Sequence, residues 1–162
     1  MKTGNYFIDL ADILNKNDLL HKPQTIWNMD EKGVSMEHTP VKVVADKASR
    51  NTPGRVANSH QSNTIIACIN ATGKSMPPMI IIKGKTDKSP RGFTVLEGPV
   101  GSKWTYQQNA WTEDILGVEW FKGVFLAHCG EERPRLIILD GHHSHEAIGI
   151  IDAARKEDIL FI

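Results

Sequence analysis

The sequence has few of the features that identify a class of protein at first sight. Its two cysteines, Cys68 and Cys129, are too few and too far apart for a disulfide framework or a zinc finger. We interpret both as reduced thiols packed as small hydrophobic side chains. The formal net charge is zero, so the chain lacks the overall basic excess of many nucleic-acid-binding proteins. Redox chemistry is therefore not indicated, and any attraction to nucleic acid has to come from local clusters of charge.

Long hydrophobic runs are also absent. No stretch approaches the roughly 20 apolar residues that span a bilayer. The N-terminal segment MKTGNYFIDLADIL carries acids where a signal peptide requires an uninterrupted apolar run. We expect a soluble, intracellular chain of 162 residues that forms one globular domain or a substantial part of one.

Two aspartates each end an apolar run. Asp30 follows Thr25–Met29, and Asp140 follows Arg135–Leu139 and precedes Gly-His-His-Ser-His. Both runs predict buried strands, the second one covered on both faces. If the two strands lie adjacent and parallel, both carboxylates emerge at the same edge of a sheet, where they can bind a divalent metal ion. For either residue alone, an aspartate that simply caps a turn is the alternative.

The remaining pattern predicts a mixed α/β fold. Helical spacing predicts helices over residues 7–20, 111–128 and 147–156. Strands are expected over 25–29, 41–45 and 62–70 as an antiparallel meander, and over 136–139 and from 159 onward. A further short strand over 79–82 is expected at an edge, because Pro77 and Pro78 precede it. The order is a three-strand meander followed by helix, strand, helix and strand.

Positive charge is concentrated in two segments that are rich in Gly, Pro, Ser, Thr and Asn. That composition predicts loops or hairpins rather than helices. Basic loops around an acidic site suit a phosphate backbone, although solvated surface charge without a partner explains them equally well. The candidate nucleic-acid-binding residues are Lys42, Lys47, Arg50 and Arg55 in the first segment, and Lys83, Lys85, Lys88 and Arg91 in the second.

Several blocks of sequence occur in a distinctive order. They are IWNMDEKG from Ile26, TIIACINATGKSMPP from Thr64, AWTE from Ala110 with Trp120-Phe121, and LDGHHSH from Leu139. Together they resemble the DDE superfamily endonuclease domains of pogo- and Tigger-type transposases in the mariner superfamily, and of their domesticated jerky-like relatives. No single block would suffice, but the combined pattern is specific.

This resemblance implies an RNase H-like fold in which Asp30 and Asp140 are catalytic and bind two Mg²⁺ or Mn²⁺ ions. Mg²⁺ prefers hard oxygen ligands, which carboxylates provide. In two-metal sites one ion activates the attacking hydroxyl or water and the other stabilises the leaving oxygen. The resemblance further implies DNA as the partner, a nuclear location, and neither a membrane nor a small-molecule substrate. It leaves the oligomeric state open, a homo-oligomer included.

The family's third acidic ligand follows its fifth strand, and this chain ends at Ile162. We therefore expect a linker helix over 1–22 and a DDE endonuclease domain over 23–162 that is truncated at its C-terminus, with cleavage impaired. The alternatives are a catalytically inactive, domesticated DNA-binding or interaction protein, and a nonfunctional fragment of a transposable element.

The neighbours of the two aspartates are expected to support them. Strand alternation points Glu31 to the face opposite Asp30, which predicts a structural or supporting role. His142 and His145 fit a role in ordering the loop beside Asp140. His142, His143 and His145, together with His128 and Cys129, also suggest a zinc site, which is less favoured because no partner cysteine pair is present.

Overall fold

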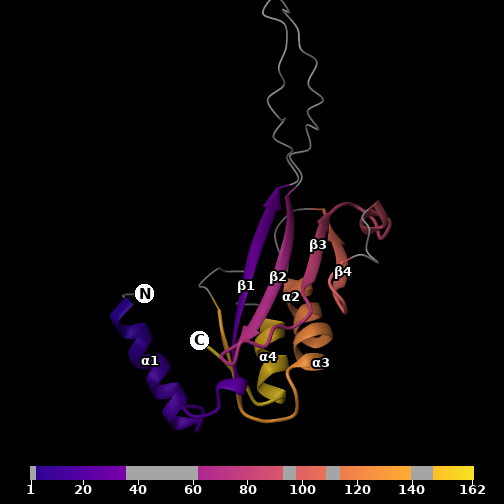
Figure 1. Cartoon of the computed structure of the whole chain (residues 1–162). Coiled ribbons are helices and arrows are strands. Elements are labelled where there is room, and N and C mark those ends of the chain that lie inside the picture. Colours follow the sequence, from indigo (N-terminus) through magenta and orange to yellow (C-terminus); the bar gives the residue numbers. More distant parts are fainter. Residues whose placement is uncertain (1–2, 36–61, 93–97, 109–113, 140–147) are drawn as a thin grey trace, which may run out of the picture.

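The computed structural model describes residues 3–35, 62–92, 98–108, 114–139 and 148–162. Its centre is a six-stranded mixed sheet with strand order β4-β3-β2-β1-β5-β6 (Figure 1). The strands are β1 (Ile26–Ser35), β2 (Ser62–Asn70), β3 (Met79–Lys83), β4 (Lys103–Gln107), β5 (Arg135–Ile138) and β6 (Ile159–Phe161). The helices are α1 (Thr3–Lys16), α2 (Asp114–Trp120), α3 (Leu126–His128) and α4 (Ile148–Lys156), with short helical segments η1 (Pro23–Thr25), η2 (Ser89–Gly92) and the π-helical η4 (Phe121–Phe125). The expected mixed α/β fold is confirmed.

Strand β1 lies between an antiparallel neighbour and a parallel one. It pairs antiparallel with β2 from Trp27↔Asn70 to Ser35↔Ser62. On its other side it pairs parallel with β5, and the last pair is Asn28↔Ile138. The expected parallel docking of the strand before Asp140 beside the strand that carries Asp30 is therefore confirmed.

The antiparallel meander is built differently from the expectation. Strands β1, β2 and β3 form it, while the segment 41–45 lies outside the described residues. The prediction that 79–82 is an edge strand is wrong, because β4 pairs parallel with β3 along its length. Both prolines precede Met79, the first residue of β3, so they remove no backbone N–H that the strand needs for pairing on either side. The sequence KWTYQ of β4 mixes long polar residues with strand formers, and its strand was not foreseen.

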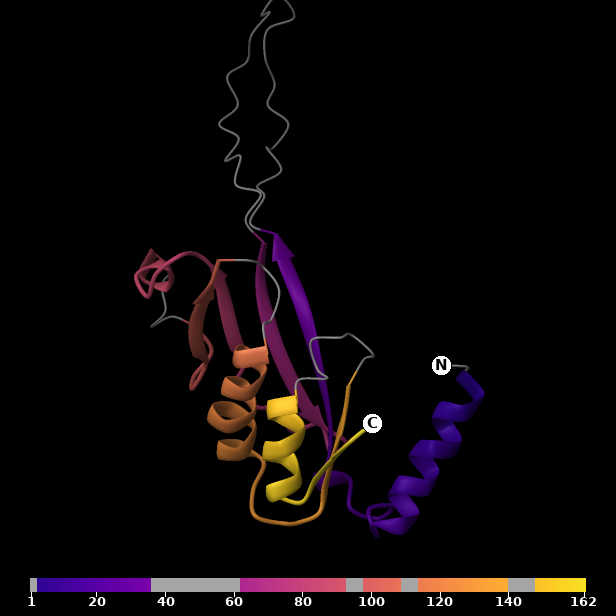
Figure 2. The ribbon, with the colours of Figure 1, turned by 180° about the vertical axis from the view of Figure 1, so that it is seen from behind.

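Helices α2, α3 and α4 and the segment η4 cover one face of the sheet (Figure 2). Trp27 of β1 packs edge-on against Phe125, with ring centroids 6.0 Å apart. Phe121 stacks on the same ring at 5.6 Å, so the π-helical turn directs two aromatic side chains into the core. Each is fully buried and contributes on the order of 2 kcal/mol by leaving water.

The side chains of β1 alternate between the two faces of the sheet. Trp27 and Met29 are buried among the helices, whereas Asn28 and Asp30 are exposed. Because successive strand residues point to opposite faces, Asn28 and Asp30 lie together on the face that these helices leave open. The core packing of β1 therefore fixes the direction of its polar residues.

Helix α1 ends at Lys16, four residues before the expected end at Leu20. Asp18 adopts a left-handed conformation (φ 54°), and the Leu19 N–H donates to the Leu14 carbonyl at 2.9 Å. This is the geometry of a helix C-cap, which ends the helix before Pro23 can. Figure 1 shows α1 apart from the helices that cover the sheet, on the side of β5 and β6.

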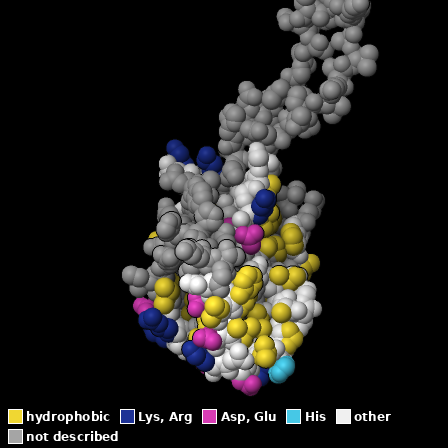
Figure 3. Space-filling view, turned by 90° about the vertical axis from the view of Figure 1, so that its left-hand side faces the viewer, with side chains coloured by type: hydrophobic (Ala, Val, Ile, Leu, Met, Phe, Trp, Pro, Cys, Tyr) yellow, Lys and Arg dark blue, Asp and Glu magenta, His cyan; other side chains and the backbone are white. Residues whose placement is uncertain are grey.

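Hydrophobic side chains gather on the side of the molecule that carries α1 (Figure 3). Phe7 and Ile8 of this helix are 64% and 63% exposed. Side chains so exposed gain little from the transfer out of water. Helix α1 therefore contributes little to the stability of the sheet and its helices. The boundary between a linker helix over 1–22 and a domain over 23–162 remains a prediction.

The chain leaves the helical layer through a tight turn at Gly130. This residue has a left-handed φ of +86°, and a Cβ there would lie 2.9 Å from Nη2 of Arg135. Arg135, the first residue of β5, is only 3% exposed, and its Nη1 donates to the Gln24 carbonyl at 3.3 Å. Burial lowers the pKa of this guanidinium from its usual value. The turn thus places β5 beside β1 with a buried arginine at its base.

Candidate functional site

Asp30 lies on the exposed side of β1, where its carboxylate faces solvent. Its Oδ1 accepts a hydrogen bond from the backbone N–H of Glu31 at 2.9 Å. Within the described part of the chain this is the one hydrogen bond to the carboxylate, so Oδ2 is available to a ligand. A hard, exposed carboxylate oxygen suits a divalent cation such as Mg²⁺.

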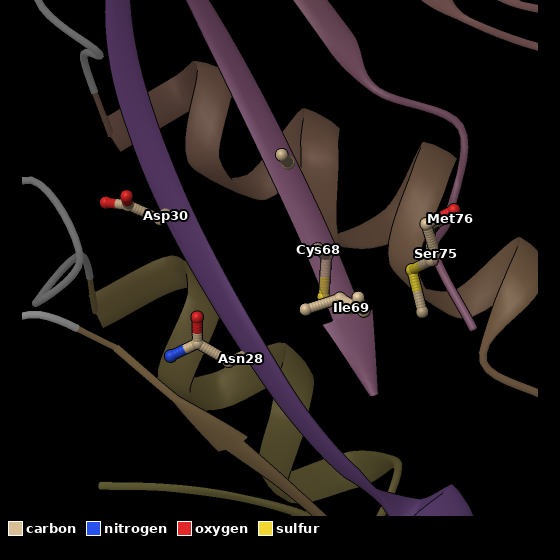
Figure 4. A pocket seen from close by; sticks show the side chains of 7 residues that line it. Asn28, Asp30, Cys68, Ile69, Ser75 and Met76 are labelled. Atoms are coloured by element: carbon tan, nitrogen blue, oxygen red, sulfur yellow. The ribbon is translucent and has the colours of Figure 1, made fainter. Parts of the chain in front are cut away.

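A hollow of about 310 Å³ borders Asp30 on the open face of the sheet. Its walls are formed by Asn28, Asp30, Ala67, Cys68, Ile69, Ser75 and Met76. Figure 4 shows Asn28 and Asp30 projecting from β1 to the same side, while β2 and the segment after it supply the other residues. The volume is at the low end of the range of small-ligand pockets, roughly 300 to 1,000 Å³. Polar residues of β1 and mostly apolar residues of β2 and the segment after it thus border one hollow.

The far wall of this hollow is held by a turn at the end of β2. The Asn70 Oδ1 accepts hydrogen bonds from the Thr72 N–H, the Thr72 hydroxyl and the Lys74 N–H at 3.1, 2.7 and 2.8 Å. The chain then returns along β2, where the Met76 N–H donates to the Cys68 carbonyl at 2.9 Å. This network fixes Met76 beside β2 at the edge of the hollow.

Asp140 lies outside the described residues, as do His142 and His145. The structure fixes the strand that leads to it: the last parallel pair is Asn28↔Ile138, and Asp30 and Asp140 each follow two residues later in the sequence. Glu31 is half-buried next to the exposed Asp30, as strand alternation predicts. The roles assigned to these residues remain predictions.

The basic residues of the second charged segment lie at and beyond the end of β3. Lys83, Lys85, Lys88 and Arg91 are all exposed, and Arg91 contacts Asp87 at 3.4 Å. Lys83 ends β3 and the other three follow it, so none lies on the strand of Asp30. The other four candidate residues, Lys42, Lys47, Arg50 and Arg55, lie outside the described residues.

Neither cysteine has the surroundings of a nucleophile or of a metal ligand. Both are buried free thiols in the core, as the sequence predicted. Burial, reinforced by the nearby Cys129, raises the pKa of the Cys68 thiol to about 12. The Nδ1 of His128 lies 2.8 Å from the Val124 carbonyl. Among the residues that the structure describes, no three His, Cys, Asp or Glu side chains are grouped to hold a metal, and the less favoured zinc site gains no support.

Asn28 was not singled out from the sequence, although it shares a strand, a face and a hollow with Asp30. The sequence does place Asn28 two residues before Asp30, and residues two apart on a strand point to the same face. Ile69 and Ser75, on the opposite wall, carried no such signal, because their position depends on the turn at Asn70.

Solved structures with a similar fold belong to the Mos1 transposase. Its paired-end complex with the left transposon end matches 93% of this chain and 38% of that chain, with a TM-score of 0.52 and 12% identity. Its strand transfer complex matches 97% of this chain and 38% of that chain, with a TM-score of 0.54 and 14% identity. At these identities the likeness shows the fold alone.

A curated relative, the MFS-type transporter clz9 of Cochliobolus lunatus, is 25% identical over 142 residues. The match covers 84% of this chain and 15% of that protein, so the chain spans a small part of its length. In the described ranges, no helix has the length and apolar character needed to cross a membrane.

The family model described as DDE superfamily endonuclease matches residues 60–162, well over half of the chain. The matched segment includes β2 to β6 and the sequence LDGHHSH that contains Asp140. This chain therefore belongs to the DDE superfamily endonucleases.

Proposed function

We propose that the chain is the DNA-binding endonuclease domain of a pogo- or Tigger-type transposase, or of a domesticated jerky-like relative. The observation that carries the proposal is the parallel pairing of β1 with β5. Parallel neighbours end at the same edge of a sheet, so we expect Asp30 and Asp140, each two residues beyond the pair Asn28↔Ile138 in the sequence, to lie close together. The fold and the family model support the same assignment.

Asp30 and Asp140 are the residues that would hold divalent metal, Mg²⁺ or Mn²⁺. When bound, a pair of such ions supplies Lewis acidity to the attacking and leaving oxygens of a phosphodiester. The chain's own contribution is to fix the direction of the ligands. The buried Trp27 and Met29 prevent β1 from rotating, and the Glu31 N–H orients the Asp30 carboxylate through Oδ1.

DNA is the proposed partner. The similar Mos1 structures are complexes with a transposon end and a strand transfer complex, and one of them contains Mn. The exposed residues Lys83, Lys85 and Lys88 would contact phosphates, because their positive charges attract the negatively charged backbone of DNA. A protein that acts on chromosomal DNA belongs in the nucleus, which we propose as its location.

A second candidate is DNA binding without cleavage. The observation in its favour is that Lys83, Lys85 and Lys88 are exposed and lie apart from the strand of Asp30. Phosphate contacts from lysines need no bound metal ion, so they persist where metal binding is weak. We therefore expect the 162-residue chain to bind DNA and to cleave it weakly or not at all.

The test combines measurements of DNA binding and of Mn²⁺ binding with nicking of supercoiled plasmid in Mn²⁺. The wild-type chain is compared with Asp30→Asn and Asp140→Asn, and with Asp12→Asn, an exposed aspartate of α1 that contacts Lys16, as the control. We expect DNA binding by the wild type and weaker Mn²⁺ binding in the first two variants only. Absence of DNA binding would refute the proposal. Strong nicking that both variants abolish would replace the binding candidate with a competent enzyme.

A further inference from the structure

Three asparagines lie on strands of the sheet, and the side chains of two of them make hydrogen bonds that hold the fold. The Oδ1 of Asn63 accepts the Lys83 N–H at 3.1 Å, which ties β2 to the end of β3. The Asn70 side chain organises the turn after β2 and donates to the Gln24 carbonyl at 3.4 Å. Both residues are buried, at 6% exposure each. Their amides are satisfied, as buried polar groups normally are.

Asn28 is the exception. It is exposed on β1, and its amide makes no hydrogen bond within the described part of the structure. Its neighbours in the sheet are Ile69 on β2 and Ile138 on β5, whose side chains have no hydrogen-bonding groups. A side-chain amide carries two N–H donors and an acceptor oxygen. Asn28 lines the same hollow as Asp30, and Figure 4 shows the two side chains projecting from β1 to the same side, away from β2.

Residues two apart on one strand lie about 6.6 Å from each other. That spacing places the Asn28 amide within reach of a group bound at Asp30. A carboxylate has no donor and repels a phosphate, whereas an amide is neutral and donates. Donation from the amide would therefore complement a cation held by the carboxylate without adding charge.

We propose that Asn28 binds the phosphodiester of the DNA substrate, with its Nδ2 donating a hydrogen bond to a non-bridging oxygen. The inference rests on the proposed function, since it takes DNA as the ligand. The cross-strand partner of Asn28 fits the same ligand: Ile69 is 46% exposed and offers the deoxyribose an apolar surface without competing donors. Asn28 is thus assigned as a substrate-positioning residue beside Asp30.

The test uses two substitutions of Asn28 and two measurements on the full chain. Asn28→Ala removes the amide, and Asn28→Asp keeps an acceptor but replaces the donor with a charge. Affinity for a fluorescein-labelled duplex is measured by anisotropy in Ca²⁺, and affinity for Mn²⁺ alone is measured by electron paramagnetic resonance. Asn15→Ala is the control, because the Asn15 amide contacts the Ala11 carbonyl within α1, away from the sheet.

We expect Asn28→Ala to weaken DNA binding about tenfold, the typical effect of losing a hydrogen bond to a charged group. Its Mn²⁺ affinity should match that of the wild type. Asn28→Asp should weaken DNA binding at least as much without losing Mn²⁺. The control variant should match the wild type in both measurements, and thermal unfolding should show that all variants fold.

Three outcomes would overturn the inference. Unchanged DNA affinity in Asn28→Ala would reject it while leaving the proposed function intact. Retained DNA affinity in Asn28→Asp, with tighter Mn²⁺ binding, would mean that residue 28 faces the cation instead of the phosphate. Failure of the wild-type chain to bind DNA would reject both proposals together.

Discussion

Asn28 of β1 and Ile138 of β5 are paired across a parallel ladder, although 110 positions separate them in the sequence. The two strands run in the same direction at this pair, and Asp30 and Asp140 each lie two residues further along the sequence. If both aspartates hold the same cation, neither binds it well alone.

The first prediction is that Asp30→Asn and Asp140→Asn act on one site. We expect each substitution to weaken Mn²⁺ binding at least about tenfold, and the double variant to lose little more than either single variant. Residues that share a ligand show such non-additive behaviour. Electron paramagnetic resonance of Mn²⁺ measures the affinities. Losses that simply add in the double variant would place the two aspartates in separate sites.

The second prediction concerns the exposed lysines beyond β3. Replacing Lys85 or Lys88 with Gln should lower DNA affinity for all sequences alike and reduce the slope of log affinity against log salt by about 1. Titrations at several salt concentrations measure this slope. Lys16→Gln on α1, where Lys16 contacts Asp12 at 3.8 Å, is the matched control and should leave the slope unchanged. Equal effects from all three variants would indicate attraction by overall charge only.

The third prediction compares two glycines with the same backbone conformation. Gly73 has φ +89° with no atom near an added Cβ, whereas at Gly130 the added Cβ meets the buried Arg135. Gly73→Ala should lower the free energy of unfolding by about 1 to 2 kcal/mol, the cost of a left-handed alanine. Gly130→Ala should lose more, since Arg135 has little room to move. Urea denaturation measures both, and equal losses would show that Arg135 rearranges freely.

The fourth prediction concerns stability at high pH. The Cys68 thiol has a pKa of about 12 in the folded chain, against about 8.5 for an ordinary thiol. Above pH 8.5 or so the unfolded state loses the proton while the folded state keeps it, so stability falls as pH rises toward 12. Urea denaturation at about pH 8 and about pH 10 should therefore show a smaller loss in Cys68→Ala than in the wild type. An equal loss would mean that other groups cause it.

Much of the fold was predictable because apolar runs identify buried strands directly. β5 is wholly apolar in its centre, and β2 is long and rich in strand formers, so both were predicted within one or two residues. β4 was missed because a strand with one covered face and polar ends resembles a loop in sequence. The end of α1 was misplaced because the left-handed Asp18 carries no sequence signal comparable to a glycine.

The site was predictable only in part. Asp30 could be located because it follows buried residues of β1, and strand alternation gave its face. Asn28 could not be separated from an ordinary surface asparagine, since its distinguishing property is the absence of a hydrogen-bond partner among the described residues. Recognising that property requires the apolar neighbours Ile69 and Ile138, which the sequence places far away.

The position of β1 also bears on the order in which the chain folds. β1 is made early in synthesis, but β5, its parallel neighbour, follows more than a hundred residues later. Contacts between distant segments form slowly, because closing the long loop costs entropy before the contact stabilises the chain. The antiparallel part, β1 to β3, can assemble first, and the pairing of β1 with β5 is completed later. A nascent chain would therefore form its antiparallel strands before it could complete the proposed metal site.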